Sequence, residues 1–151
     1  MIKKNTLLIL LVLLLGGLSF YINRDRFGVE PVQVSDRSMQ PRGAGLRQAG
    51  DSAANLVVFL FSRELSLTSV KVVVASDAAT NKHPRAIWEL ASDSGSAPVK
   101  DFIYGMNIQG MKPAATGALA ESLQPGVKYR LLVAAGSRHF EHDFIPTPRM
   151  P

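Results

Sequence analysis

The feature that most constrains this chain is a stretch of nineteen uncharged residues near its N-terminus, from Asn5 to Asn23. Leucine, isoleucine and valine fill most of its centre. As an α-helix, a stretch of this length extends about 28 Å, close to the ~30 Å thickness of a bilayer's hydrocarbon core. Phe20 and Tyr21 stand where interfacial aromatic residues are expected. The stretch predicts one transmembrane helix, and we assign residues 1–26 to an N-terminal signal anchor with its flanks.

The charges on either side of this stretch predict its orientation. Lys3 and Lys4 precede it, and Arg24, Asp25 and Arg26 follow it. Basic residues tend to remain on the cytoplasmic side of a membrane. The two arginines weaken this bias. Asp25 lies between them and offsets part of their charge, and the free amino group adds positive charge on the N-terminal side. We therefore expect a bacterial inner-membrane protein with its N-terminus inside and its C-terminal domain in the periplasm.

A cleaved signal peptide is the alternative interpretation, because it shares the basic start and the apolar centre. The segment has no A-x-A site, and the best candidate cleavage follows Ser19, with Gly17 at the second position that requires a small residue. Phe20, Tyr21 and Ile22 continue the apolar run beyond that point. We favour an uncleaved anchor and keep a secreted domain, released by cleavage near Ser19, as the alternative.

The distribution of charge argues against nucleic acid as a partner. The chain of 151 residues has a net charge of +5, of which +3 lies within residues 1–26. The remaining basic residues are dispersed, without the basic run or aromatic-interleaved stripe that follows a phosphate backbone. The chain has no cysteine, which excludes disulfides, thiol catalysis, cysteine-ligated zinc and a lipid-modified cysteine.

The rest of the chain has the length and pattern of one small β domain. Residues 27–55 contain a short strand, Glu30–Ser35, which we expect to join the core, and a loop or linker rich in Gly, Pro and Arg. Residues 56–145 alternate between apolar, β-branched runs and turn residues, and form the expected core. Residues 146–151 are proline-rich and are expected to be a disordered tail.

Within the core, six more strands are predicted, and Arg63-Glu64 is predicted to form a hairpin turn between the first two. About seven strands without a long amphipathic helix predict an all-β, antiparallel sandwich preceded by one transmembrane helix. The six core strands are expected at Leu56–Phe61, Leu65–Ala75, Arg85–Ala91, Val99–Met106, Val127–Ala135 and Arg138–Ile145.

The segment Leu123–Ala135 carries the most specific motif. Pro125-Gly126 turns the chain into a strand whose alternating apolar residues, Tyr129 among them, face inward. This segment resembles the tyrosine-corner region of fibronectin type III and immunoglobulin-like domains. The resemblance implies an immunoglobulin/fibronectin-like sandwich in which Tyr129 is buried and its hydroxyl group contacts backbone upstream. Trp88 is expected in the same core, so Trp88, Pro125, Gly126 and Tyr129 are expected to be structural residues.

The densest polar cluster lies near the C-terminus. On a strand, His139, Glu141 and Asp143 face one way while His142 faces the other, so the two histidines cannot hold one ion without a bulge. A solvated strand face is the simpler interpretation. No G-x-S-x-G, Walker or H-E-x-x-H motif is present. We therefore expect no catalytic residue, no cofactor and no metal, and the alternative is an envelope hydrolase or carbohydrate-active domain with this cluster near its site.

Apolar residues also occur in a connection that should be polar. Met106, Ile108 and Met111 lie among turn residues, and methionine adapts to irregular partners. They form either a contact surface or a cap that folds back over an open end of the sandwich. The expected function is a binding or scaffolding module of the cell envelope, whose partner is another envelope protein or a glycan.

Overall fold

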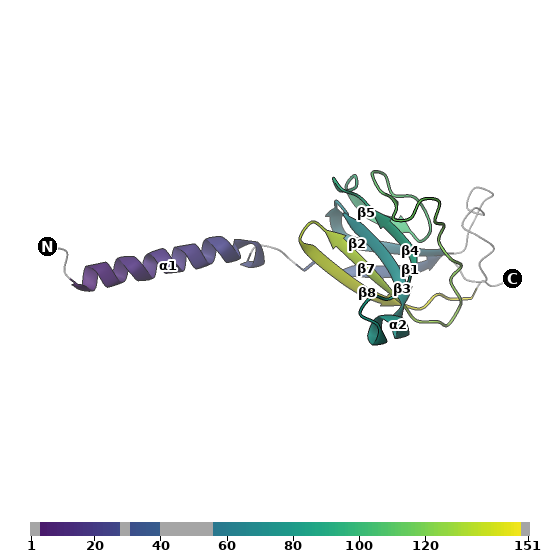
Figure 1. Cartoon of the computed structure of the whole chain (residues 1–151), viewed down its shortest axis with the longest axis horizontal. Coiled ribbons are helices and arrows are strands. Elements are labelled where there is room, and N and C mark those ends of the chain that lie inside the picture. Colours follow the sequence, from purple (N-terminus) through teal and green to yellow (C-terminus); the bar gives the residue numbers. More distant parts are fainter. Residues whose placement is uncertain (1–3, 28–30, 40–55, 149–151) are drawn as a thin grey trace. The chain divides into compact units, whose positions relative to one another are not determined.

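The computed structural model describes residues 4–27, 31–39 and 56–148 (Figure 1). Contacts divide the chain into two units, Met1–Pro31 and Val32–Pro151. The first contains helix α1, Lys4–Phe27, on which the large apolar side chains that are described between Leu8 and Ile22 are exposed. Within the described residues, no helix is both long enough and apolar enough to cross a membrane.

The second unit is mostly β. A three-stranded antiparallel sheet has the order β1-β2-β5, formed by β1 (Val34–Met39), β2 (Leu56–Leu65) and β5 (Val99–Ile103). A five-stranded antiparallel sheet has the order β6-β4-β3-β7-β8. Its strands are β3 (Ser69–Val74), β4 (Ala86–Ala91), β6 (Lys112–Pro113), β7 (Tyr129–Ala135) and β8 (Arg138–Phe144). The prediction of a mostly β chain with antiparallel strands is confirmed, and the two sheets are consistent with the predicted sandwich.

Alternation along the strands creates the core between the sheets. On β2, Val57, Phe59 and Phe61 are buried, as the period of two predicts for one face of a strand. Phe59 lies 5.3 Å from Phe102 of β5 and 4.9 Å from Phe144 of β8, measured between ring centres. One buried ring therefore contacts side chains of both sheets.

The predicted hairpin at Arg63-Glu64 is wrong. Strand β2 continues through both residues to Leu65, and the next strand, β3, belongs to the other sheet. The side chains of Leu65 and Leu67 are 8% and 0% exposed, so the crossing from one sheet to the other buries both leucines in the core. Arg63 and Glu64, near the end of β2, have the local pattern of a turn because they interrupt an apolar run.

Other predicted boundaries also differ from the structure. The first strand spans Val34–Met39 rather than Glu30–Ser35. Its polar residues belong to the strand because β1 pairs with β2 along the whole length of β1. Helix α2, Ala75–Thr80, follows β3 and begins at Ala75, which was predicted to end a strand. Residues 40–55 of the predicted linker and 149–151 of the predicted tail lie outside the described residues. Pro146 does not fit a disordered tail, because it is buried and its carbonyl oxygen accepts a hydrogen bond of 3.1 Å from the Gly126 N–H group.

Strand β1 is also connected to the opposite sheet. Asp36 faces Phe59 across β1 and β2, and its Oδ1 atom lies 2.7 Å from Nε2 of His142 on β8. The two side chains are 29% and 24% exposed, so this contact is shielded from solvent more than an ordinary surface ion pair. It joins one edge of each sheet.

We predict that Asp36 and His142 stabilise the fold as a pair. Asp36→Asn and His142→Gln should each lower the free energy of unfolding, and the double variant should lose about 1 kcal/mol less than the sum of the two. Urea titration of the four proteins, followed by Trp88 fluorescence, measures this coupling. Strictly additive losses would show that the contact contributes nothing as a pair.

Tyr129 occupies the inner face of β7 as predicted. The side chain is 4% exposed, its ring stacks on Phe144 with 5.7 Å between the ring centres, and its hydroxyl oxygen accepts a hydrogen bond of 3.0 Å from the Gln124 N–H group. Pro125-Gly126 forms the turn before it, and Gly126 has a φ of +77°, which favours glycine. The ring and the hydroxyl group thus fix the chain where it enters β7.

We predict that Tyr129→Ala lowers the free energy of unfolding by about 3–5 kcal/mol, because it removes a buried ring and leaves a cavity. Tyr129→Phe loses only the hydrogen bond, with a cost of about 1 kcal/mol. Urea titration measures both, with the exposed Ile145→Ala as the control. A loss below about 1 kcal/mol for Tyr129→Ala would contradict the burial of this ring.

Candidate functional site

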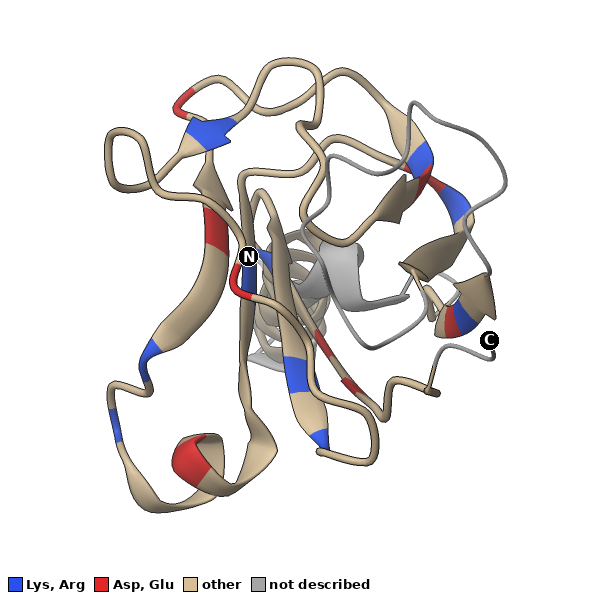
Figure 2. Ribbon diagram, turned by 90° about the vertical axis from the view of Figure 1, so that its right-hand side faces the viewer, with Lys and Arg blue, Asp and Glu red and all other residues tan. Residues whose placement is uncertain are grey.

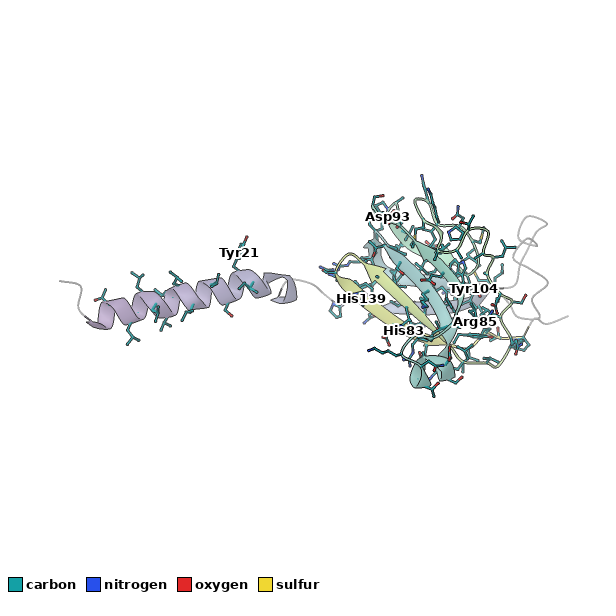
Figure 3. The ribbon with its side chains drawn as sticks, in the orientation of Figure 1. Tyr21, His83, Arg85, Asp93, Tyr104 and His139 are labelled. Carbon is teal, nitrogen blue, oxygen red and sulfur yellow. The ribbon has the colours of Figure 1, made fainter. Side chains whose placement is uncertain are left out.

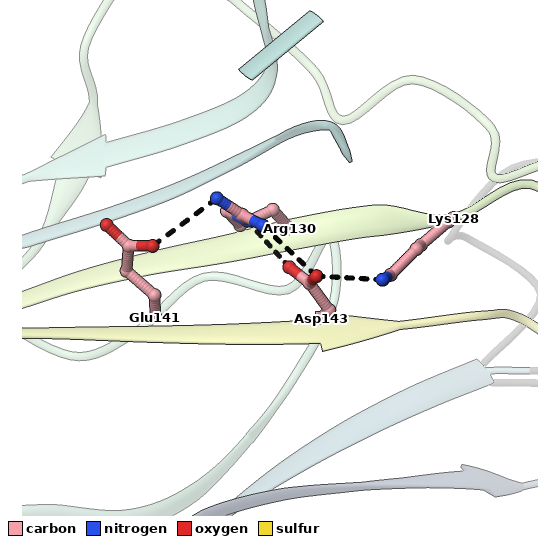
Figure 4. A network of polar contacts seen from close by, with 4 residues as sticks. All are labelled: Lys128, Arg130, Glu141 and Asp143. Carbon is pink, nitrogen blue, oxygen red and sulfur yellow. Dashed lines mark hydrogen bonds and ion pairs between the residues drawn. The ribbon is translucent and has the colours of Figure 1, made fainter. Parts of the chain in front are cut away.

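The polar cluster predicted on the last strand lies on the outer face of the five-stranded sheet. Its carboxylates face basic residues near the start of β7 (Figure 4). The Nε and Nη2 atoms of Arg130 donate to the two carboxylate oxygens of Asp143 at 2.6 and 3.1 Å. Lys128 Nζ lies 3.0 Å from the same carboxylate, and Arg130 Nη1 lies 3.5 Å from Glu141. Arg130 and Asp143 are cross-strand partners, so the sheet itself positions this bidentate pair.

The electrostatics of this cluster keep its central carboxylate ionised. The hydrogen bonds from Arg130 are the main cause that lowers the pKa of Asp143 from 3.8 to about 2, and Lys128 contributes in the same direction. The hydrogen bond to Asp143 likewise raises the pKa of Arg130. A carboxylate held in this way is a poor proton donor or acceptor near neutral pH. The cluster is therefore suited to cross-strand pairing rather than to acid–base chemistry.

The histidines do not assemble into a site. His139 is exposed and lies opposite Ala134, whereas His142 points to the inner face and contacts Asp36. His83 is exposed in the connection between α2 and β4, and Figure 3 places Asp93 away from both His83 and His139. Among the described residues, no group of three or more His, Asp or Glu side chains could hold a metal ion.

The predicted contact surface at Met106, Ile108 and Met111 needs correction. Ile108 and Met111 are 4% and 3% exposed and belong to the core, and only Met106 is exposed. The loop folds back because the Ala97 N–H group donates to the Gln109 carbonyl oxygen at 3.0 Å. The structure thus favours the alternative in which this loop caps the sandwich, and two of the three residues are withdrawn from any partner.

Trp88 is buried in the interior of the sandwich. The side chain is 6% exposed and its ring meets the ring of Tyr104 edge-on, with 5.1 Å between the centres. The hydroxyl group of Tyr104 donates to the Glu121 carbonyl oxygen at 2.8 Å, and burial raises the pKa of this hydroxyl group. Trp88 therefore packs against a residue that also anchors the long connection before β7.

Sequence reasoning missed a cleft between β4 and this connection, which we call the β4 cleft. It is bounded by residues 86–89 on one side and by residues within 114–121 on the other, and its volume is about 370 Å³. Leu119 on its rim is 88% exposed. The only sequence signal was a run of small residues interrupted by a single leucine, which does not by itself indicate a cleft.

Charge is mixed over the surface of the sandwich. Figure 2 shows basic and acidic residues interspersed along the strands and loops rather than separated into large fields.

Comparison with protein-family models, with curated proteins and with solved structures finds no match to this chain. The proposed function therefore rests on the contacts, burial and charges of the described residues.

We predict that the Asp143 cluster makes stability depend on acid pH. The folded-state pKa of about 2 lies below the ordinary value of 3.8, so the stabilisation is complete above about pH 5 and is lost as the pH falls through about 2. Asp143→Asn removes this contribution, and this variant should be less stable than the wild type at pH 6, with a difference that shrinks towards zero as the pH falls below about 2. Thermal unfolding across this range measures the difference. A difference that stays constant with pH would contradict the ion-pair role of Asp143.

Proposed function

We propose that this chain is a single-pass membrane protein whose extracytoplasmic β-sandwich acts as a binding or scaffolding module of the bacterial cell envelope. The observation that carries the proposal is the exposure of aliphatic side chains all around α1. Leu8, Leu11 and Leu13 are 63%, 57% and 70% exposed, and Leu14 is 60% exposed. Successive residues point in different directions on a helix, so no single face of α1 is polar. Such a surface is stable in a lipid environment and not in water.

The length of the uncharged stretch supports the same proposal. The uncharged stretch runs from Asn5 to Asn23, which brings it to the length of a bilayer core. Lys3 and Lys4 favour a cytoplasmic N-terminus and a periplasmic sandwich.

We also propose that the sandwich is fibronectin type III-like or immunoglobulin-like. Two features support this. A three-stranded sheet β1-β2-β5 is combined with a sheet in which β4, β3, β7 and β8 are neighbours, as in two-sheet sandwiches of this kind. The Tyr129 hydroxyl group, near the start of β7, is bonded to the backbone of Gln124 five residues upstream, as in a tyrosine corner.

A binding role is supported by the way the polar residues are used. The carboxylates of Glu141 and Asp143, which an envelope hydrolase or carbohydrate-active domain would need, are engaged by Arg130 and Lys128. A scaffold of this kind hosts many functions, so the partner must be sought at loops and clefts rather than inferred from the fold.

Membrane anchoring is tested by fractionating cells that express the full chain. We expect the protein in the membrane pellet after carbonate extraction, with a mass that retains the stretch Asn5–Asn23. Val12→Arg combined with Leu13→Arg should move it to the soluble fraction, because charge at the centre of a span is costly. Ile145→Arg is the matched control, since this exposed residue lies outside the helix. A wild-type chain that is soluble, or that begins near Phe20, would contradict the anchor.

The binding role is tested by crosslinking in native membranes. A photoreactive group at Leu119 should capture a defined neighbour, whereas the same group at Lys82, an exposed residue outside the β4 cleft, should not. Identical products from both positions would argue against a specific binding module.

A further inference from the structure

The β4 cleft is held open by contacts at both of its ends. Towards one end, the Ala114 N–H group donates to the Glu89 carbonyl oxygen at 3.1 Å. At the other, the Glu121 N–H group donates to the Ile87 carbonyl oxygen at 3.0 Å, and the Glu121 carboxylate pairs with Arg85. The chain between these two anchor points leaves the edge of β4 and turns at Gly117, where φ is +77°. The cleft is therefore formed before any ligand arrives, which reduces the entropy cost of binding.

The wall behind the cleft is rigid. Ile87 and Trp88 are 9% and 6% exposed, and the Trp88 ring rests on Tyr104. Tyr104 in turn is bonded to the Glu121 carbonyl oxygen. Figure 3 shows Tyr104 and Arg85 on the same side of the sandwich, and both contact Glu121. A ligand in the cleft would thus contact a part of the protein that does not need to move.

The lining of the cleft has a distinct chemical character. Apart from four alanines, its members are Ile87, Trp88, Leu119 and two carboxylates, Glu89 and Glu121. Arg85 pairs with Glu121, and Lys71 lies opposite Glu89 in the sheet, but neither basic residue lines the cleft. The Glu121 carboxylate is therefore already paired, and Glu89 is the carboxylate of the lining that forms no ion pair with a described residue. The lining thus combines a small apolar hollow with one unpaired acidic group.

We propose that the β4 cleft binds a segment of a partner protein in which one aliphatic side chain is flanked by lysine or arginine. The aliphatic side chain enters the hollow beside Leu119, and a flanking cation lies near Glu89. Charge complementarity selects this occupant, because the unpaired Glu89 carboxylate at the border of the hollow repels an acidic segment and attracts a basic one. The inference rests on the proposed binding function and specifies its surface and the chemistry of its partner.

The test uses the full-length protein in neutral detergent and a capped Lys-Leu-Lys tripeptide as the probe. Trp88 is the only tryptophan of the chain, so its fluorescence reports on the cleft directly. We expect a saturable change with a Kd of roughly 0.1–1 mM, as suits a ligand with one buried side chain. Capped Glu-Leu-Glu and Lys-Ser-Lys should bind at least about fivefold more weakly, because each lacks one of the two required features.

Variants then locate the binding. Leu119→Ser and Glu89→Gln should each weaken binding of Lys-Leu-Lys by roughly three- to tenfold. Ile145→Ser removes another exposed aliphatic residue, 52% exposed and outside the cleft, and should leave binding unchanged. The fluorescence spectrum of each free variant checks that it is folded, and a misfolded Glu89→Gln would leave Leu119→Ser as the deciding variant.

The proposal is overturned if the three tripeptides titrate alike, if no saturation is seen, or if Leu119→Ser binds as well as the wild type. Its failure differs from a failure of the proposed function. A chain that stays in the membrane and yields a specific crosslinked neighbour at Leu119 while its Trp88 signal is flat would retain the binding role and lose the basic segment as the ligand of the β4 cleft. A chain that binds Lys-Leu-Lys selectively but is not retained in membranes would lose the anchor and keep the cleft.

Discussion

The packing of the two sheets against each other depends on the contacts of Phe59. This residue is completely buried on β2, the central strand of the three-stranded sheet, and it contacts Phe102 beside it and Phe144 in the other sheet. Aromatic rings contribute large apolar areas and specific edge-to-face geometry, so one such residue fixes both the spacing and the alignment of the sheets. The Asp36–His142 hydrogen bond spans the same gap nearer to its edge. Strand β1, on whose inner face Val34 packs against the core beside Asp36 and Ser38, thereby gains a polar connection to the second sheet.

The alignment of the sheets also decides what the charged residues can do. Alternation on β8 turns His142 inward and Glu141 and Asp143 outward, and pairing with β7 places Arg130 directly opposite Asp143. A carboxylate that accepts two hydrogen bonds from one guanidinium group is held in an ion pair, so it is not free to act as a ligand or as a base. The same cluster that suggests chemistry in the linear sequence is therefore a cross-strand contact in the folded chain.

Strands β7 and β8 could be predicted almost to the residue because their alternation is strict and their turns contain Pro125-Gly126 and Gly136. The hairpin at Arg63-Glu64 was wrong because a polar pair in an apolar run has the same local pattern whether the chain turns or continues. Strand β1 was misplaced since Asp36 acquires its role only from His142, 106 residues away. The β4 cleft was invisible for the same reason: it arises where residues 114–121 lie against a strand formed about 30 residues earlier.

Two of the apolar features that the described residues leave exposed, helix α1 and the rim of the β4 cleft, are most easily understood together. A hollow that receives one aliphatic side chain can bind only weakly, because so small a contact gains little beyond the entropy cost of association. A helix that confines the domain to a membrane raises the concentration that the cleft experiences for any partner confined to the same membrane. Weak binding is then sufficient to keep a partner in the cleft. Charge complementarity can discriminate between partners through the rate at which they associate and the position in which they bind. The proposed anchor is then part of the proposed recognition mechanism, because it would make a shallow cleft with an exposed leucine at its rim an effective site.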